Sequence, residues 1–288
     1  MFQIKTLKGN PMRLDGGAMF GNAPKALWSR WLEADDLNRI DIDANCLLIR
    51  TGQAVILFET GPGAYLSPKM KERFGVVSND HVLLESLAAE GIGPEDVTHV
   101  VLSHLHFDHA GGLLTAHEDG KEPELVFSSA RYITGRENFE RSRAPKLRDR
   151  ASFIPGLADM LAVTEKLDLM GHGDGLDIDG VKIEFVESLG HTPGMLVSKI
   201  QAGEAHLIFT GDLVPGHPWV NLPITMGYDR FPEALVEEKA VLLDQAFRDD
   251  AWLVFPHDGV CAAARLELDE VKTRFVPRDL TACLALTA

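Results

Sequence analysis

The sequence has few cysteines, no long apolar run and no excess of basic residues. Its three cysteines (Cys46, Cys261 and Cys283) are an odd number without the spacing of a metal site, so we expect reduced thiols rather than a disulfide framework. No segment approaches the roughly 18 apolar residues of a membrane-spanning helix. The N-terminal stretch MFQIKTLKGNPMRLDGG also lacks the uninterrupted apolar core of a secretory signal. Together these features predict a cytoplasmic protein with no membrane partner.

Positive charge is also scarce. The chain has 28 Lys and Arg against 43 Asp and Glu, which gives a formal net charge of −15. Binding to a nucleic-acid backbone requires concentrated positive charge, so no nucleic-acid partner is expected. Low-complexity tracts and repeats are missing as well, and residues 1–288 are therefore expected to form a single domain.

The pattern of apolar residues predicts strands in two groups with helices between them. Residues 46–49 and 54–58 predict a β-hairpin, and residues 97–103, 181–188 and 252–255 predict further strands. Helices are expected at 78–90, with Ser78 and Asn79 as candidate caps, and from Pro232, with Val241 on the apolar side. This order indicates an α+β fold in which sheets pack together with helices outside.

The middle of the chain, residues 131–175, differs in texture because arginine and lysine crowd its first part. One interpretation is a solvated helix face. The other is a helical cap, inserted over an active site, that meets an anionic substrate or a second subunit. The basic residues concerned are Arg131, Arg136, Arg141, Arg143, Lys146, Arg148 and Arg150.

Four apolar strands run directly into residues that bind metals. The strand at 97–103 leads into the sequence His104-Leu-His106-Phe-Asp108-His109, and later strands lead into His191, Asp212 and His257. Alternate residues of extended chain point the same way, and the following Ala-Gly-Gly permits a tight turn that lets His109 join them. Imidazole suits zinc and iron, and a carboxylate can bridge two cations. The lone histidines elsewhere are expected to be structural: His81, His99, His117, His172 and His206.

This ligand pattern resembles that of the metallo-β-lactamase superfamily, from the hairpin at 47–61 to His257. The resemblance implies a four-layer αββα sandwich with two divalent metal ions at one edge, Zn²⁺ in the first place, with Fe or Mn as alternatives. It assigns three ligands to each ion and places Asp212 between them. The first set is His104, His106 and His191, and the second is Asp108, His109 and His257.

Within that superfamily, the run SHLHFDHAGG at 103–112 is most similar to the N-acyl-homoserine lactonases, and the glyoxalase II branch is also similar. Two positions differ from the familiar pattern. Glu59 replaces the aspartate that usually supports the metal loop, and Pro215 stands where the lactonases have a tyrosine that contacts substrate. We therefore expect this chain to share the metal chemistry of the lactonases more closely than their substrate.

We expect a hydrolase in which a hydroxide held between the two metals attacks a small ester or lactone. Asp108 and Asp212 are the expected catalytic residues; Asp108 orients the water and passes its proton to the leaving group. A thioester or phosphoester substrate is an alternative, and so is an iron-dependent oxidoreductase similar to persulfide dioxygenases. A non-catalytic metal-binding module is a further alternative.

The substrate is expected to be a small molecule that meets apolar side chains near the ligands. The stretch 16–31 is rich in glycine and large apolar residues, and other candidates lie close to ligands in the sequence. Family resemblance also suggests a homodimer. The substrate-binding candidates are Met19, Phe20, Trp28, Phe107, His217 and Tyr228, with Trp31, Trp219 and Met226 beside them.

Overall fold

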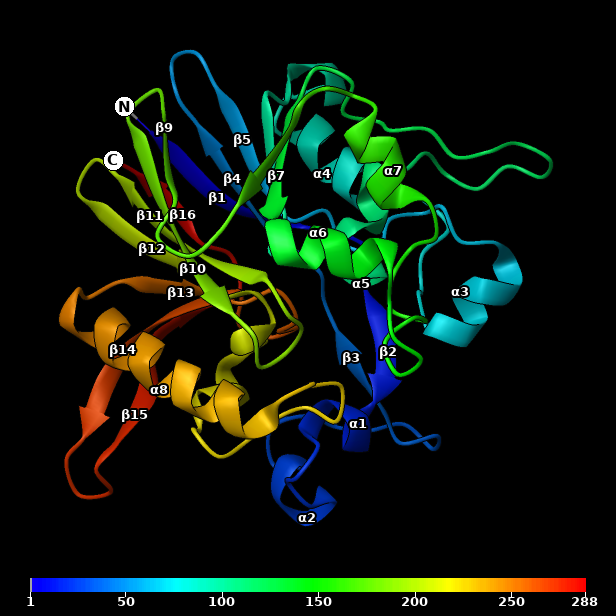
Figure 1. Ribbon diagram of the computed structural model, residues 1–288. Helices are drawn as coiled ribbons and strands as arrows, with labels where there is room; N and C mark the ends of the chain where they lie inside the picture. The colour runs from blue at the N-terminus through cyan, green and yellow to red at the C-terminus, as the bar shows by residue number, and fades with distance from the viewer. Residues whose placement is uncertain (1) are drawn as a thin grey trace.

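The structure is a computed structural model that describes residues 2–288. Two seven-stranded sheets pack face to face, with helices on their outer faces (Figure 1). The first sheet has the order β16 (Ala285–Thr287), β1 (Gln3–Lys8), β4 (Asn45–Arg50), β5 (Val55–Phe58), β6 (His99–Val101), β7 (Arg131–Gly135) and β8 (Leu167–Met170). The second has the order β15 (Arg274–Thr281), β14 (Ala263–Asp269), β13 (Trp252–Val254), β12 (Ala205–Phe209), β11 (Met195–Ala202), β10 (Val181–Ser188) and β9 (Gly175–Ile178).

The remaining elements are helices and one small ribbon. The ribbon pairs β2 (Met12–Asp15) with β3 (Arg39–Ile42). The α-helices are α1 (Gly16–Phe20), α2 (Lys25–Trp28), α3 (Pro68–Phe74), α4 (Val82–Ala89), α5 (Phe107–Ala110), α6 (Arg136–Arg143), α7 (Leu157–Ala162) and α8 (Pro232–Arg248). Short 3₁₀ turns are η1 (Pro94–Asp96), η2 (Gly111–Leu113), η3 (Gly211–Leu213) and η4 (His217–Val220).

Alternate residues of the strands serve two different apolar layers. In β4, Leu47 packs into the core between the sheets, whereas Leu48 packs into the core beneath the helices. Across the inter-sheet core, Phe58 of β5 stacks on Phe209 of β12 with ring centroids 6.1 Å apart. Because successive side chains of a strand point to opposite faces, strands covered on both sides are apolar throughout. The predicted αββα sandwich is confirmed.

Helices cover both sheets from outside. Helix α4 packs on β1 and α6 on β7 and β8, whereas α8 packs on β14 of the other sheet (Figure 1). None of the helices in the described chain combines the length and apolar character that crossing a bilayer requires.

The segment 131–175 is not an insertion in its entirety. Its ends form β7 and β8, which pair in parallel within the first sheet. Only the part between them, with α6, α7 and the loop that joins them, lies outside the sheet. That loop contacts α5, because Phe107 N donates to Ser152 O over 2.7 Å.

Two predicted helices differ in detail from the observed ones. Helix α4 begins at Val82, not at 78, because Asn10 Oδ1 accepts the Val82 N–H over 3.1 Å and takes the part expected of Ser78. In α8 the expected apolar residue Val241 is 72% exposed, whereas Lys239 is fully buried. The Lys239 ammonium donates to Ile224 O over 2.6 Å, which satisfies it inside the protein.

Candidate metal centre

Loops at the carboxyl ends of strands carry the candidate ligands. Strands β5 and β6 are parallel, and so are β12 and β13, so each pair ends at one edge of its sheet. Glu59 follows β5, and His104 follows β6 by way of Ser103. On the other sheet Asp212 follows β12 and His257 follows β13. The two sheets thus face each other with polar loops at a shared edge.

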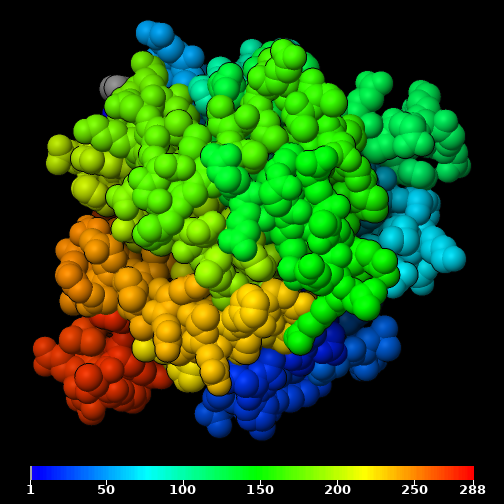
Figure 2. Space-filling view, viewed as in Figure 1, coloured from blue at the N-terminus to red at the C-terminus, as the bar shows by residue number. Residues whose placement is uncertain are grey.

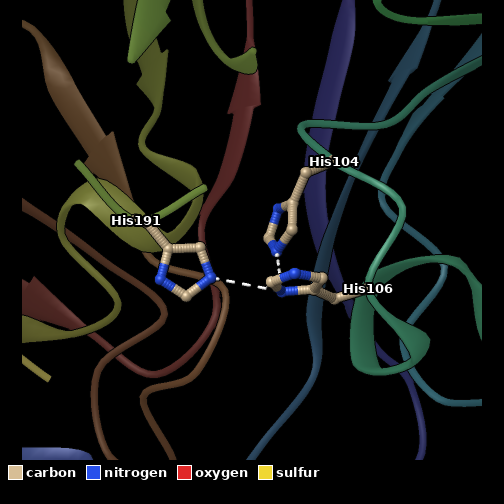
Figure 3. Close-up of side chains that lie close together, drawn as sticks. All are labelled: His104, His106 and His191. Carbon is tan, nitrogen blue, oxygen red and sulfur yellow. Dashed lines mark hydrogen bonds between the residues drawn. The ribbon is translucent and has the colours of Figure 1, made fainter. Parts of the chain in front are cut away.

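Three imidazoles meet in the first ligand set. His104 Nε2 lies 2.9 Å from His106 Nδ1, and His106 Nδ1 lies 3.2 Å from His191 Nε2 (Figure 3). The two rings from the 104–106 loop and the ring of His191 point toward one another from opposite sides (Figure 3). All three side chains are buried.

The second set joins Asp108, His109 and His257. His109 Nε2 lies 3.0 Å from His257 Nε2, and His257 Nε2 lies 3.6 Å from Asp108 Oδ2. Glycine makes this packing possible: a Cβ on Gly112 would overlap the carbonyl oxygen of Thr60. The glycines after His109 therefore also allow the backbone at Gly112 to pack closely against that at Thr60.

Asp212 lies between the two sets. Its Oδ2 is 3.2 Å from His191 Nε2, and its Oδ1 is 3.3 Å from His109 Nε2 and 3.2 Å from His257 Nε2. This buried Oδ1 has no hydrogen-bond partner among residues 2–288. A buried carboxylate oxygen without a donor is costly, and its position between two groups of ring nitrogens suits a cation.

Outer partners fix which nitrogen of three rings carries the proton. Glu59 Oε2 lies 3.2 Å from His109 Nδ1, Asp229 Oδ1 lies 2.9 Å from His191 Nδ1, and the Asp43 carbonyl lies 3.1 Å from His257 Nδ1. A carboxylate or carbonyl oxygen only accepts, so each Nδ1 donates and each Nε2 keeps its lone pair.

In the neutral rings the inward Nε2 atoms carry no proton. His109 Nε2 and His257 Nε2 face each other over 3.0 Å, and two lone pairs at that distance repel unless a proton or a metal ion lies between them. The residues therefore fit divalent metal ions. Three groups of candidate ligand atoms lie mutually within 4.8 Å: His104, His106 and His191; His104, His109 and Asp212; and Asp108, His109 and His257.

The charges of the centre favour a cation as well. Burial, together with the neighbouring imidazoles, holds the pKa of His104 and His106 well below the usual value, which keeps both rings neutral. Burial lowers the pKa of His109, but Asp212, Glu59 and Asp108 outweigh it and raise that pKa. The carboxylates thus attract positive charge to this end of the site, which protons or metal ions can supply in competition.

Glu59 supports the loop that carries His104 and His109, although it replaces the usual aspartate. Its Oε1 accepts the Ser103 N–H over 2.7 Å while Oε2 accepts from His109. The backbone of Glu59 lies in the left-handed region at φ +65°, which is uncommon for a glutamate. Residues in such conformations are concentrated at functional sites. The turned backbone, combined with the longer side chain, lets one carboxylate hold both the loop and a ring.

A cavity of about 340 Å³ opens onto the centre. Of the predicted substrate-binding residues, Met19, Phe107 and Tyr228 line it, as does Met226. Its other lining residues include Leu14, Arg73, Phe74, Arg148, Asp149, Ala151, Ser152, Gly227 and Arg230, together with the ligands His106, Asp108, His191, Asp212 and His257.

Phe20, Trp28 and His217 do not line this cavity. Phe20 lies in a buried aromatic stack, with its ring 5.5 Å from that of Trp28 and 4.4 Å from that of Trp219. His217 Nδ1 is held at 2.5 Å by Asp258 Oδ2. Large apolar residues near a ligand in the sequence are as suited to a core as to a pocket, and here packing decides for the core.

Sequence reasoning missed Asp229, which orients His191, and two arginines of the cavity wall, Arg73 and Arg230. Asp229 lies 38 residues beyond its partner and carries no local motif. Arg148 belongs to the basic cluster at 131–150, for which contact with an anionic substrate is one of the interpretations from the sequence. A signal for Asp229 would have been an acidic residue next to the cavity residue Tyr228.

Five buried imidazoles and two carboxylates at the edge of a two-sheet sandwich define the metal centre of a metallo-hydrolase. The chain belongs to the metallo-β-lactamase superfamily, whose sequence model matches residues 39–257. It is thus a member of a metallo-hydrolase family, and this fold implies divalent metal ions.

Relatives agree with this assignment. A probable metallo-hydrolase of Mycobacterium tuberculosis is 30% identical over 220 residues, which cover 68% of this chain and 66% of that protein. An N-acyl homoserine lactonase of Bacillus cereus is 25% identical over 187 residues, 59% of this chain and 63% of that one. The chain thus spans slightly less than two thirds of the length of these relatives.

Solved structures share the fold over nearly the whole chain. A probable metal-dependent hydrolase from Staphylococcus aureus superposes with a TM-score of 0.83 at 26% identity, covering 97% of this chain and 98% of that one. The dizinc quorum-quenching lactonase AidC has a TM-score of 0.76 at 20% identity, covering 97% and 95%. The second likeness concerns the fold alone.

Proposed function

We propose that this protein uses two divalent metal ions, zinc in the first place, to hydrolyse a small ester or lactone. The observation that carries the proposal is Asp212 between two complete ligand sets, with the fixed lone pairs of His109, His191 and His257 directed inward. In this proposal His104, His106 and His191 would hold one ion, Asp108, His109 and His257 would hold the other, and Asp212 would be shared by both sets. When bound, such a pair of ions lowers the pKa of a coordinated water and polarises a carbonyl oxygen.

The residues of the chain then position the reactants. Asp108 is both a candidate ligand and part of the cavity wall, so its carboxylate is placed to accept a proton from the attacking water and to return it to the leaving oxygen. A protein thiol is a poor alternative nucleophile. Burial raises the pKa of Cys46 well above its usual value and that of Cys261 to about 11, which keeps both protonated at neutral pH.

The wall of the cavity supports an acyl substrate. Met19, Phe74, Phe107 and Met226 give it an apolar side, and 340 Å³ is at the small end of the range for small-molecule sites. Relatives named N-acyl homoserine lactonase support the same choice. The cytoplasmic location, the small-molecule partner and the homodimer stay predictions.

Metal content and turnover, measured together, test the proposal. The purified protein is loaded with zinc, its metal is counted by mass spectrometry, and lactones, esters, thioesters and phosphodiesters are assayed. We expect two ions per chain and hydrolysis of a lactone or carboxylic ester. In Asp212→Ala we expect about one ion and activity near background, because the carboxylate shared by both sets is gone.

Asp168→Ala is the matched control, because Asp168 is a partly exposed residue paired with Arg131 at 2.6 Å and does not line the cavity. It should keep both ions and full activity. Undiminished turnover by Asp212→Ala would end the dinuclear mechanism. One iron per chain with oxygen consumption would instead establish the oxidoreductase alternative.

A further inference from the structure

Arginines gather on the cavity wall of this acidic protein. Arg73 comes from α3, Arg148 from the loop between α6 and α7, and Arg230 from the segment before α8. The chain as a whole carries a net charge of −15, so three guanidinium groups around one small cavity run against its composition. In Figure 2 the green surface that follows α6 meets the blue surface where Figure 1 places α1 and α2.

Arg148 and Arg230 have no carboxylate within 4.0 Å among the residues that the structure describes. Each is held instead by a backbone carbonyl: Arg148 Nη2 donates to Gly227 O over 3.0 Å, and Arg230 Nη2 donates to Tyr228 O over 3.0 Å. One carbonyl uses only part of the five donors of a guanidinium group. Both side chains are therefore fixed at the cavity with donors to spare.

Three other arginines near Arg148 in the sequence are paired with carboxylates. Arg131 binds Asp168, Arg141 binds Asp149, and Arg143 binds Asp159. The pair of Arg141 with Asp149 matters most, because Asp149 also lines the cavity. Its Oδ2 receives two donors of Arg141 at 2.7 and 2.8 Å, whereas its buried Oδ1 has no hydrogen-bond partner among the described residues. Asp149 raises the pKa of Arg230, but burial and Arg148 lower that pKa by more.

The two unpaired cations also act on each other and on the metal centre. Burial lowers the pKa of Arg230, and Arg148 lowers it further. Arg230 is in turn among the charges that lower the pKa of His106, after burial and the neighbouring imidazoles. Like charges held together beside a site are stabilised when an anion binds between them, and arginine suits an anionic oxygen group because its donors form a planar fork.

We propose that Arg148 and Arg230 form an anion-binding subsite that selects substrates with a carboxylate remote from the bond that is cleaved. This inference rests on the proposed hydrolase function and adds the class of substrate to it. The apolar wall contacts the short chain between the two ends of such a substrate. A subsite of this kind orients the acyl group so that its carbonyl faces the ligands.

A matched pair of esters tests the subsite. 4-Nitrophenyl valerate and mono-4-nitrophenyl glutarate share the leaving group and the length of the acyl chain, and they differ in a terminal methyl or carboxylate. For the metal-loaded wild type we expect kcat/KM to be about tenfold or more higher for the glutarate ester, as charge-assisted hydrogen bonds imply. Added NaCl should lower that preference, because the subsite is open to solvent.

Variants assign the preference to the two arginines. In the double variant Arg148→Met/Arg230→Met the ratio of the two kcat/KM values should fall about 10- to 100-fold. Arg230→Lys keeps the charge but loses the planar fork, so its ratio of the two kcat/KM values should lie between those of the wild type and the double variant. Arg136→Met is the matched control, because Arg136 also donates to a backbone carbonyl, Leu169 O at 2.7 Å, but does not line the cavity. Melting temperatures of all variants check their folding.

The results of these assays distinguish failure of the anion subsite from failure of the proposed hydrolase function. Equal efficiency on both esters in the wild type overturns the anion subsite and leaves the hydrolase in place. A preference for the glutarate ester that survives in the folded double variant also overturns it, because the carboxylate then binds elsewhere. If metal-loaded wild type hydrolyses neither of these esters nor any lactone, the proposed function fails and the subsite fails with it.

Discussion

The double contact of Glu59 makes a sharp prediction about how the metal centre is tuned. In Glu59→Gln, the side chain keeps its shape but one acceptor oxygen becomes an NH₂ donor. If the amide oxygen stays at Ser103 N, the NH₂ group faces the N–H of His109 Nδ1, and two donors meet. The ring then shifts its proton to Nε2, or the amide turns and abandons Ser103. Either change removes support from the ligand loop.

The size of the effect follows from the role of such partners in metal sites. Loss of a partner that orients a ligand costs about 10- to 100-fold in metal affinity, which corresponds to about 1.4–2.7 kcal/mol of binding free energy. We expect this loss in the set that contains His109 and little change in the set of His104, His106 and His191. Without metal, the free energy of unfolding should fall by about 1–2 kcal/mol, because a buried charged acceptor of two donors is replaced.

Competition with a chromogenic chelator measures the two affinities, and urea unfolding of the metal-free protein measures stability. Glu90→Gln is the control, because Glu90 pairs with Lys5 on the surface, where an ion pair contributes little. Glu59→Asp adds a second comparison: aspartate tolerates positive φ better, but its side chain is one methylene shorter, so we expect it to keep only one of the contacts to Ser103 and His109. Wild-type affinity for both ions in Glu59→Gln would refute the view that Glu59 sets the proton position on His109.

Two further predictions concern stability away from the metals. Burial lowers the pKa of Lys239 to about 8 from 10.5, so the folded state holds fewer protons than the unfolded state between those values. The burial penalty is then fully present below pH 8, and the free energy of unfolding should rise by about 3 kcal/mol as the pH increases to 10.5. Urea titrations at both ends of this range should show the rise in wild type but not in Lys239→Met; an equal rise in both would contradict the assignment. Phe20→Ala should cost about 3–5 kcal/mol, measured by urea unfolding against Phe231→Ala, whose side chain is 53% exposed; a loss below 1 kcal/mol would argue that the aromatic stack contributes little.

How far the sequence predicted the centre depended on whether a signal was local. His104, His106, Asp108 and His109 lie within six residues, so their spacing alone carried the pattern. Later ligands such as His191 were found because a buried strand ends beside each of them, and sandwiches bring strand ends to one edge. The assignment of ions to these residues is still a prediction.

Contacts between distant parts of the chain were out of reach. Asn10 caps a helix that begins at Val82, and Arg148 is held by Gly227, 79 residues away. Neither pairing has a pattern in sequence, because each depends on which loops the finished sandwich brings together. The prediction that Phe20 binds substrate was wrong for a related reason. An aromatic residue near glycine suits a pocket or a stack equally well, and only the position of Trp219 decides between them.

Each ligand set draws on both sheets, and this has a consequence for folding. His104 and His106 follow β6 of the first sheet, and His191 follows β10 of the second; likewise His109 joins His257, which follows β13. The two halves of each set therefore meet only when the inter-sheet core has formed. An ion bound by a complete set ties one sheet to the other and stabilises the folded state by its binding free energy. In the proposed dinuclear centre, metal affinity and the packing of the sandwich are thus one linked equilibrium, and Asp212, between the sets, would couple the two ions.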